Sequence, residues 1–395
     1  MPDNTGSTPQ DVISILRGVM DPELNDNIVD LGMVRSAEVE DGEAVITIAL
    51  TTAGCPLRAT IKRDVQHRVE TLPDITSVTL RWDELTADEK ARTMERARAK
   101  ARDDARPTRV PTSTRVLAIA SGKGGVGKSS VTVNLAAGLA AKGHTVGVLD
   151  ADIWGFSVPR MLGVSERLEA ERDVETDRPV IRPEKALVGD GEIQVVSMGL
   201  LVESEDSALM WRGLMLAKAV EQFLNDVAWG DMDYLLVDMP PGTGDVQMAL
   251  ARLLPQAEMI VITTPALGAQ KVASRVADMA RRSHMPVVGV IENMGAFVAP
   301  DGASYPLFGQ GGGQRLSDEI GAPLIGSIPL EPAVGAGGDE GVPVALGSDG
   351  PASIAIRGIV ERLVDEISPP TDIGGCSARM LAAIDDALGA LDRPR

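Results

Sequence analysis

Residues 115–130 read RVLAIASGKGGVGKSS, and this stretch decides the fold. Residues 116–120 are uniformly apolar, which predicts a buried strand. The residues after it fit G-x-x-x-x-G-K-[ST], a pattern in which glycines let backbone N–H groups curl around a phosphate, with a helix N-terminus directed at the same anion. The residues predicted to form this nucleotide-binding loop are Gly122, Lys123, Gly124, Gly125, Val126, Gly127, Lys128 and Ser129.

The end of this loop indicates a nucleoside triphosphate bound with Mg²⁺. Lys128 is expected to reach the β- and γ-phosphates, and the Ser129 hydroxyl is expected to hold Mg²⁺. Residues 234–238 read YLLVD, an apolar strand that ends in Asp238, and this is the metal contact that a Walker B strand supplies. The sequence therefore predicts ATP or GTP as the ligand, with Ser129 and Asp238 on the metal.

A dinucleotide-binding loop is the competing interpretation of the same glycines. Gly122, Gly124 and Gly127 also match G-x-G-x-x-G, and Asp150 ends the next predicted strand, where such folds place an acid. However, Lys128 and Ser129 have a role only with a nucleoside triphosphate and Mg²⁺. The triphosphate interpretation is therefore favoured.

Residues 115–367 alternate between apolar strands and helix-length segments. Because buried strands that alternate with helices form parallel sheets covered on both faces, we expect an α/β fold, a mostly parallel P-loop NTPase sheet. Residues 165–191, rich in Glu, Arg and Asp, are expected to be a surface excursion, and a tail over 368–395 is expected to hold a short helix at 377–391. The predicted strands cover residues 116–120, 145–149, 234–237, 259–263 and 287–291.

Residues 1–83 are predicted to form a small α+β domain of order α-β-β-α-β. Asp41-Gly42 lies between two strand-like runs and indicates a hairpin. Leu57, Ile61, Val65 and Val69 recur every four residues, which predicts the second helix.

Residues 84–114 separate the two predicted domains. The stretch 86–110 carries eight basic and five acidic residues, a local positive surplus on an acidic chain. We expect a charged, solvated helical linker. The alternative is a docking segment for an acidic partner or for the second domain of the same chain.

Composition and charge exclude some partners. The 395 residues carry 38 basic and 57 acidic side chains, a formal net charge of −19, whereas nucleic acid and anionic membranes both demand a basic face. Residues 1–4 lack the basic start of a signal peptide, and no apolar run is long enough for a membrane-spanning helix. We therefore expect a cytoplasmic protein that binds neither nucleic acid nor membrane.

Lys123 makes the loop resemble a particular class of ATPase. A second lysine in K-G-G-x-G-K-S is the deviant Walker A signature of the MinD, ParA and nitrogenase-iron-protein class. The resemblance implies that Lys123 reaches across a subunit interface to the partner's nucleotide, so that the active form is a homodimer with ATP between its subunits. It also implies that Asp152, in Asp150-Ala151-Asp152, orients the attacking water, which makes Lys123, Lys128 and Asp152 the expected catalytic residues.

Further segments resemble the Mrp/ApbC family of iron–sulfur cluster carrier ATPases. This resemblance covers most of residues 113–367 and implies ATP-dependent delivery of clusters to apo iron–sulfur proteins or to other assembly factors. It implies that residues 240–245 form a switch loop near the γ-phosphate and that Asn293 binds adenine. The matching segments are Asp150–Gly155, Trp211–Gly213, Asp238–Asp245, Ile291–Met294, Phe308–Gly313 and Ile328–Pro332.

The first domain resembles the PaaD/SufT-like small domain of iron–sulfur assembly, which is often fused to this ATPase. The matching segments are Asp21–Glu23, Asp30–Val34 and Thr51–Leu57. Within the last of them, Cys55 precedes a predicted helix start, where the helix dipole favours the thiolate. The alternative for Cys55 is an inert buried thiol.

The cluster ligands depart from the family pattern. The family's carriers place Cys-x-x-Cys after the Glu-Asn-Met segment, where this chain has Ala299 and Gly302, neither of which can ligate iron. The chain has two cysteines, Cys55 and Cys376, which are therefore the candidate thiolates for a labile [4Fe–4S] cluster.

Two other functions compete with the cluster carrier. An ATP-gated scaffold or regulator of cluster assembly, which holds no cluster itself, would explain the missing Cys-x-x-Cys. A positioning ATPase of the MinD or ParA kind requires a basic membrane helix or a DNA-binding patch. The acidic chain disfavours both of those features.

Overall fold

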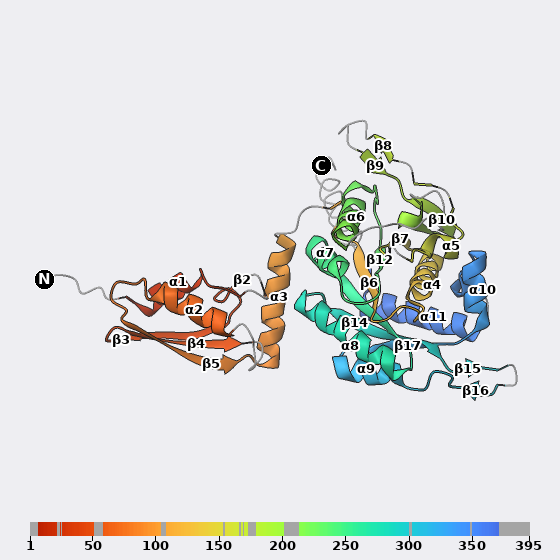
Figure 1. The fold of residues 1–395 in the computed structure, drawn as a ribbon. Coiled ribbons are helices and arrows are strands. Elements are labelled where there is room, and N and C mark those ends of the chain that lie inside the picture. The colour runs from red at the N-terminus through yellow and green to blue at the C-terminus, as the bar shows by residue number, and fades with distance from the viewer. Residues whose placement is uncertain are drawn as a thin grey trace, which may run out of the picture. The chain divides into compact units, whose positions relative to one another are not determined.

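The chain folds into two compact units, Met1–Ala105 and Arg106–Arg395, each with its own hydrophobic core (Figure 1). We describe each unit by itself. The computed structural model describes residues 7–21, 24, 26–50, 58–103, 108–152, 155–165, 167–168, 170–172, 179–200, 213–299, 302–347 and 350–370.

The first unit is built on a three-stranded sheet, β3-β4-β5, in which β3 and β4 are antiparallel and β4 and β5 are parallel. The predicted hairpin is confirmed, because Asp41 and Gly42 both have positive φ, at 46° and 80°, between β3 and β4. The elements are α1 (Pro9–Leu16), β1 (Met20–Asp21), β2 (Asp26–Asn27), β3 (Val34–Glu40), β4 (Glu43–Leu50), α2 (Arg58–Val69), β5 (Ser77–Glu84) and α3 (Ala87–Asp103).

The core of the first unit lies between the sheet and the helices α1 and α2. Ile61, Val65 and Val69 are buried along one face of α2, as their four-residue spacing predicts. Thr8 caps α1 through a reciprocal capping box with Asp11. The short hairpin β1–β2 was not predicted, since two-residue strands leave no periodic pattern.

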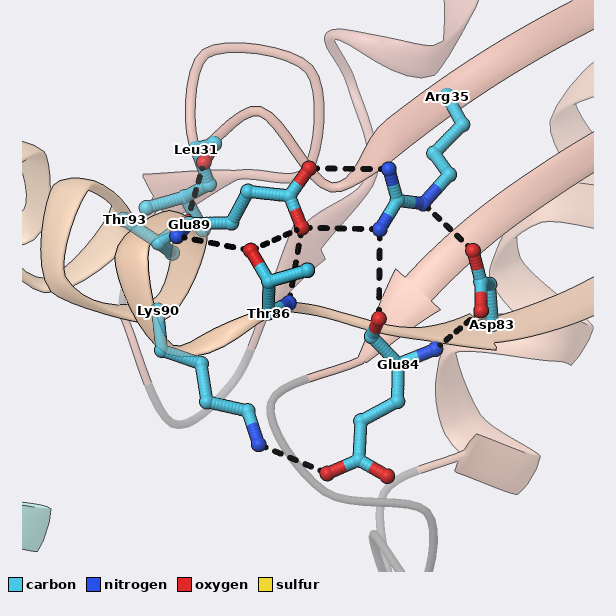
Figure 2. A network of polar contacts seen from close by, with 8 residues as sticks. All are labelled: Leu31, Arg35, Asp83, Glu84, Thr86, Glu89, Lys90 and Thr93. Carbon is cyan, nitrogen blue, oxygen red and sulfur yellow. Dashed lines mark hydrogen bonds and ion pairs between the residues drawn. The ribbon is translucent and has the colours of Figure 1, made fainter.

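Helix α3 places most of the predicted linker inside the first unit. Figure 2 shows the Arg35 guanidinium of β3 donating to both Glu89 carboxylate oxygens, each at 2.9 Å. The Thr86 backbone and hydroxyl also donate to Glu89, and these bonds together lower the pKa of Glu89 to about 2. On the next turn, the Thr93 hydroxyl is buried and donates to the Leu31 carbonyl at 2.9 Å. The segment predicted to be solvated thus contacts the small sheet and its loops.

The second unit contains an eight-stranded sheet of order β10-β11-β7-β12-β6-β13-β14-β17, parallel except for β10. This confirms the predicted α/β class with a mostly parallel sheet. The strands are β6 (Arg115–Ser121), β7 (Thr145–Asp150), β8 (Ala170–Arg172), β9 (Pro179–Ile181), β10 (Glu184–Val188), β11 (Gly191–Ser197), β12 (Tyr234–Asp238), β13 (Glu258–Thr263), β14 (Val287–Gly295), β15 (Phe297–Val298), β16 (Ser304–Tyr305) and β17 (Leu324–Pro329).

Helices cover both faces of this sheet. Helices α4 and α11 cover one face, and α7, α8 and α9 cover the other, with α6 packed beside α7 (Figure 1). The helices are α4 (Lys128–Ala141), α5 (Val158–Met161), α6 (Gly213–Asp226), α7 (Asp245–Leu253), α8 (Leu267–Arg282), α9 (Gly312–Ile320), α10 (Pro332–Glu340) and α11 (Pro351–Arg362), with short turns η1 (Met198–Leu200), η2 (Val344–Leu346) and η3 (Leu363–Ile367).

The interpretation of residues 165–191 as a surface excursion was partly wrong. Within that segment, β8 and β9 pair with each other, but β10 joins the main sheet as its antiparallel edge strand. An edge strand is covered less fully than a central one, so β10 can carry the charged residues Glu184 and Lys185. These charges are the reason that the strand was not predicted from the sequence.

The expected C-terminal helix at 377–391 lies outside the described residues, as do Cys55 and Cys376. Among the residues that the structure describes, no helix has both the length and the apolar character needed to cross a membrane.

Candidate functional site

The loop of residues 122–127 joins β6 to α4 at the edge where the parallel strands end. Gly127 caps α4 with φ 79°, a left-handed conformation that glycine adopts without strain. A Cβ at Gly127 would lie 2.2 Å from the Asn293 Nδ2 atom, and a Cβ at Gly122 would lie 2.3 Å from the backbone of Val272 in α8. Gly122 therefore requires glycine, because its neighbour is backbone, whereas a side chain at Gly127 would be strained and would displace the Asn293 amide.

Lys128, the first residue of α4, is held between two carboxylates. Its Nζ lies 2.7 Å from Asp238 Oδ1 and 3.7 Å from Asp152 Oδ2. The three side chains are 6%, 1% and 15% exposed in that order, so solvent screens these charges little. An ammonium at the positive end of a helix is unfavourable by itself. Anions must compensate it, and the carboxylates do so here, as phosphates would in the role that the sequence predicts.

Asp238, at the end of β12, collects donors from α4. The Ser129 hydroxyl donates to its Oδ2 atom at 2.5 Å, and the Thr132 hydroxyl donates to its Oδ1 atom at 2.9 Å. Hydroxyl and carboxylate oxygens are the hard ligands that Mg²⁺ prefers, so Ser129 and Asp238 fit the predicted metal role. Thr132 was not predicted from the sequence. It could have been found from its position, because it follows Lys128 by one helical turn and therefore lies on the same face of α4.

Asp150, at the end of β7, fastens the loop that carries Asp152. Its Oδ1 atom accepts the Asp152 N–H at 3.2 Å, and its Oδ2 atom accepts the Ser157 N–H at 3.3 Å. The Ser197 hydroxyl of β11 adds a third bond, to Oδ2, at 3.1 Å. Asp150 therefore holds both ends of the loop, which agrees with a capping role for this aspartate and leaves Asp152 as the one that faces Lys128.

Burial raises the pKa of both loop aspartates. The pKa of Asp150 rises to about 7, because the side chain is fully buried and lies near the Asp238 carboxylate, while the Lys128 ammonium partly opposes the rise. The pKa of Asp152 is raised by burial as well, again opposed by Lys128. The Lys128 ammonium is thus the cation that opposes the rise in pKa of Asp150 and Asp152.

The segment between β12 and α7, which is predicted to be a switch loop, touches the end of β6. Gly242 donates its N–H to the Ser121 carbonyl at 2.8 Å, with φ 91°. A loop that bonds at this position and carries glycines can change shape with the occupancy of the neighbouring phosphate site.

Asn293 reaches the nucleotide-binding loop from β14, two strands away from β6. Its Nδ2 atom donates to the Val126 carbonyl at 2.9 Å, and the residue is buried. An amide oxygen cannot face a carbonyl oxygen, so this bond turns the Asn293 Oδ1 atom away from the loop. Lys123, by contrast, is exposed at the loop, and the Ser121 hydroxyl donates to its backbone carbonyl at 3.2 Å.

The segment at which the family's carriers hold cysteines forms a short hairpin, β15–β16. The Ala299 N–H bonds to the Ala303 carbonyl, and the Gly302 N–H bonds to the Ala299 carbonyl, which closes the turn. Across the described part of the chain, no group of three or more His, Cys, Asp or Glu side chains has a metal-binding arrangement.

Two families match the chain, one for each unit. The family described as NUBPL iron-transfer P-loop NTPase matches residues 112–364, and the family described as iron-sulfur cluster assembly protein matches residues 9–80.

Individual proteins resemble large parts of the chain. An iron-sulfur cluster carrier protein of Mycobacterium leprae is 42% identical over 369 residues, which cover 91% of this chain and 94% of the relative. A protein of the same description from Synechocystis is 38% identical over 365 residues, which cover 91% and 98%. Among solved structures, a nucleotide-binding protein of Archaeoglobus fulgidus in complex with ADP is 30% identical, with a TM-score of 0.50, and covers 62% of this chain and 91% of that chain.

Proposed function

The chain belongs to the NUBPL iron-transfer P-loop NTPase family, and from that membership we propose that it hydrolyses MgATP to carry iron–sulfur clusters to apoproteins. The observation that carries the proposal is the convergence of Lys128, Ser129 and Asp238 at the end of β6, with the Asp238 carboxylate within 2.7 Å of both partners. The names of the relatives, iron-sulfur cluster carrier proteins, support the cargo.

Each residue of the site has a distinct role in this proposal. Lys128 binds the β- and γ-phosphates, and its ammonium exchanges carboxylate neighbours for phosphate oxygens. Ser129 and Asp238 hold Mg²⁺, which supplies charge stabilisation on the phosphates. Asp152 orients the attacking water. Its raised pKa and its place beside Lys128 suit a group that accepts a hydrogen bond near the γ-phosphate.

Asn293 recognises the base. With Nδ2 committed to the Val126 carbonyl, its Oδ1 atom is an acceptor, and the exocyclic amino group of adenine is a donor. Guanine carries a carbonyl oxygen at the equivalent ring position, which Oδ1 would repel. The arrangement therefore supports ATP over GTP.

Lys123 acts in trans in a homodimer. The exposure of its side chain on the nucleotide-binding loop supports a contact with a second subunit, and turnover is expected to be slow until that subunit binds. Lys123→Ala should retain ATP binding but lose turnover and ATP-dependent dimerisation. Wild-type turnover by this variant would contradict the role in trans.

Asp152 and Asp238 can be separated by kinetics. Asp152→Asn should lower kcat with little change in ATP affinity, because it removes an interaction made mainly in the transition state. Asp238→Asn should instead raise the Mg²⁺ concentration needed for activity. Equal loss of ATP binding in both variants would remove the distinction.

The cluster is cargo in this proposal, held by Cys55 or Cys376. A scaffold that holds no cluster is the second candidate function, and Ala299 and Gly302 in the β15–β16 hairpin favour it. Anaerobic reconstitution of the wild type, Cys55→Ser, Cys376→Ser and the double variant, followed by iron and sulfide analysis, separates the two. No cluster on the wild type with ATPase activity intact would favour the scaffold, and a stable cluster on the double variant would overturn both thiolate assignments.

A further inference from the structure

Strand β14 carries a bulge at the residue that reaches the nucleotide-binding loop. Its register against β17 pairs Glu292 with Ser327 and Gly295 with Pro329, so β14 has one residue more than β17 between these pairs. Met294, inside the bulge, has φ 57°, in the left-handed region that costs a non-glycine residue energy. Bulges beside functional sites re-aim a side chain. The side chain re-aimed here is Asn293, whose Nδ2 atom meets the Val126 carbonyl.

One buried carboxylate fixes the start of this bulge. Glu292 is 7% exposed, and its Oε1 atom accepts the Ser327 hydroxyl of β17 at 2.8 Å. Its Oε2 atom accepts the Gly313 N–H at the start of α9 at 2.6 Å. A negative charge is favourable there because the N-terminus of a helix is positive. Glu292 thus joins β14, β17 and α9 immediately before Asn293.

We propose that Glu292 is a positioning residue that sets the place of Asn293 and, through it, the preference of the site for adenine over guanine. The inference rests on the base-recognition role proposed for Asn293. Both carboxylate oxygens of Glu292 are bonded within the protein, to Ser327 and Gly313, so the residue would act on the base only through Asn293. It fixes the backbone from which Asn293 extends, and a hydrogen bond to a base edge weakens steeply when the acceptor shifts or tilts.

The phosphate contacts offer an internal reference for this proposal. Lys128 and Ser129 lie on α4 and are held by Asp238, and the hydrogen bonds of Glu292 go to other residues, Ser327 and Gly313. Loss of the Glu292 anchor should therefore weaken recognition of the base while largely sparing recognition of the triphosphate. General destabilisation would weaken both.

The test compares three ligands of the full chain by calorimetry: MgATP, MgGTP and magnesium tripolyphosphate. Glu292→Gln keeps the size of the side chain but removes its charge. Its Oε1 atom can still accept the Gly313 N–H, whereas its Nε2 group has to donate to the Ser327 hydroxyl, which reverses that bond. Hydrogen bonds between neutral groups contribute about 0.5–1.5 kcal/mol. A hydrogen bond to a charged group contributes about 1.5–3 kcal/mol. We expect the ratio of ATP affinity to GTP affinity to fall by about tenfold, equivalent to about 1.4 kcal/mol. Tripolyphosphate affinity should stay within about twofold of the wild type, because the anchor lies outside the phosphate contacts.

Two further variants keep the test decisive. Ser327→Ala removes only the hydrogen bond from β17 to Glu292 and is expected to disturb folding less. It should lower the ratio of ATP affinity to GTP affinity by a smaller factor. Glu331→Gln is the matched control, because Glu331 accepts the Ala352 N–H near the start of α11 at 2.7 Å, a similar contact at a different place. It should leave the ratio unchanged.

The outcomes separate this inference from the proposed function. A wild-type chain that binds no MgATP would refute the proposed function. A wild type that binds both nucleotides equally, or a Glu292→Gln variant that loses affinity equally for all three ligands, would overturn the positioning role and leave ATP binding standing.

Discussion

Lys128→Ala is expected to destabilise the second unit in the absence of any nucleotide. In a loop that only binds phosphate, the lysine would be dispensable to the folded protein. Here the Lys128 ammonium lies 2.7 Å from the Asp238 carboxylate and 3.7 Å from the Asp152 carboxylate, within a nearly solvent-free site. Alanine would leave these carboxylates, and the buried Asp150 behind them, without a cation.

The size of the effect follows from burial. At 2.7 Å the attraction is about 6 kcal/mol with an effective dielectric constant of about 20. Removing one partner of a buried pair costs about 3–5 kcal/mol, since the remaining charge is uncompensated. Part of this cost is relieved when the carboxyls take up protons. In the variant the pKa values of Asp150 and Asp152 in the folded state rise further above the unfolded values, because the Lys128 ammonium that opposes the rise is gone, so stability is lost as pH rises and regained as pH falls. The difference from the wild type should therefore be larger at pH 8 than at pH 5.5.

Urea unfolding without nucleotide, followed by hydrogen exchange and mass spectrometry, measures this effect in the full chain. Peptides report each unit separately, and the first unit, with its own core, is an internal reference. The matched control is Lys142→Ala, because Lys142 forms an exposed pair with Glu361 at 3.7 Å, and such pairs contribute at most about 1 kcal/mol.

One result would refute the reasoning. If the second unit of Lys128→Ala unfolds at the urea concentration of the wild type at pH 8, Lys128 does not sit in a buried ion pair in the nucleotide-free protein. A loss that is the same at pH 5.5 and pH 8 would show that packing, and not charge, is responsible.

Three further predictions concern other parts of the chain. The charged Glu89 carboxylate stabilises the packing of α3 on the first unit's sheet. Because its pKa is lowered from 4.5 to about 2, this stabilisation is complete above pH 4.5 and is lost as pH falls toward 2. Amide exchange across residues 87–103 should accelerate in that range, and Glu89→Gln should show the faster exchange already at pH 7. Gly127→Ala should lower ATP affinity at least tenfold in calorimetry, because its Cβ would meet the Asn293 amide and a left-handed alanine costs about 1–2 kcal/mol. Thr132→Val removes one donor to Asp238 and should raise the Mg²⁺ concentration for half-maximal ATPase activity by a few fold. Unchanged Mg²⁺ dependence would remove Thr132 from the site.

The sequence determined the features whose chemistry is local. A phosphate-binding loop is written in consecutive residues, so its place between a strand and a helix could be predicted without knowledge of the fold. The apolar strands could be predicted for the same reason, because a strand buried on both faces leaves a continuous apolar run. The Asp41-Gly42 hairpin followed from the positive φ values that only a few residue types tolerate.

Composition indicated the charged helix of residues 84–114 but not the contacts that this helix makes. Residues 84–114 have the composition of a solvated linker, yet α3 contacts the first unit through Arg35–Glu89 and through the buried Thr93 hydroxyl. Long charged side chains make their contacts through the polar groups at their ends. A helix that packs in this way lacks the apolar stripe from which its packing on the first unit could be predicted. The edge strand β10 was not predicted because it carries the charged residue Lys185, which is not typical of a buried strand.

Only the tertiary structure decided how the site is assembled. Asn293 lies 167 residues from the carbonyl that it binds, and Glu292 meets a hydroxyl on β17 and an N–H on α9. These meetings depend on the strand order, which places β13 between β6 and β14, and on a bulge of one residue in β14. Strand order and register are set by which apolar faces pack together across the whole sheet, and a local pattern of residues carries no record of that choice.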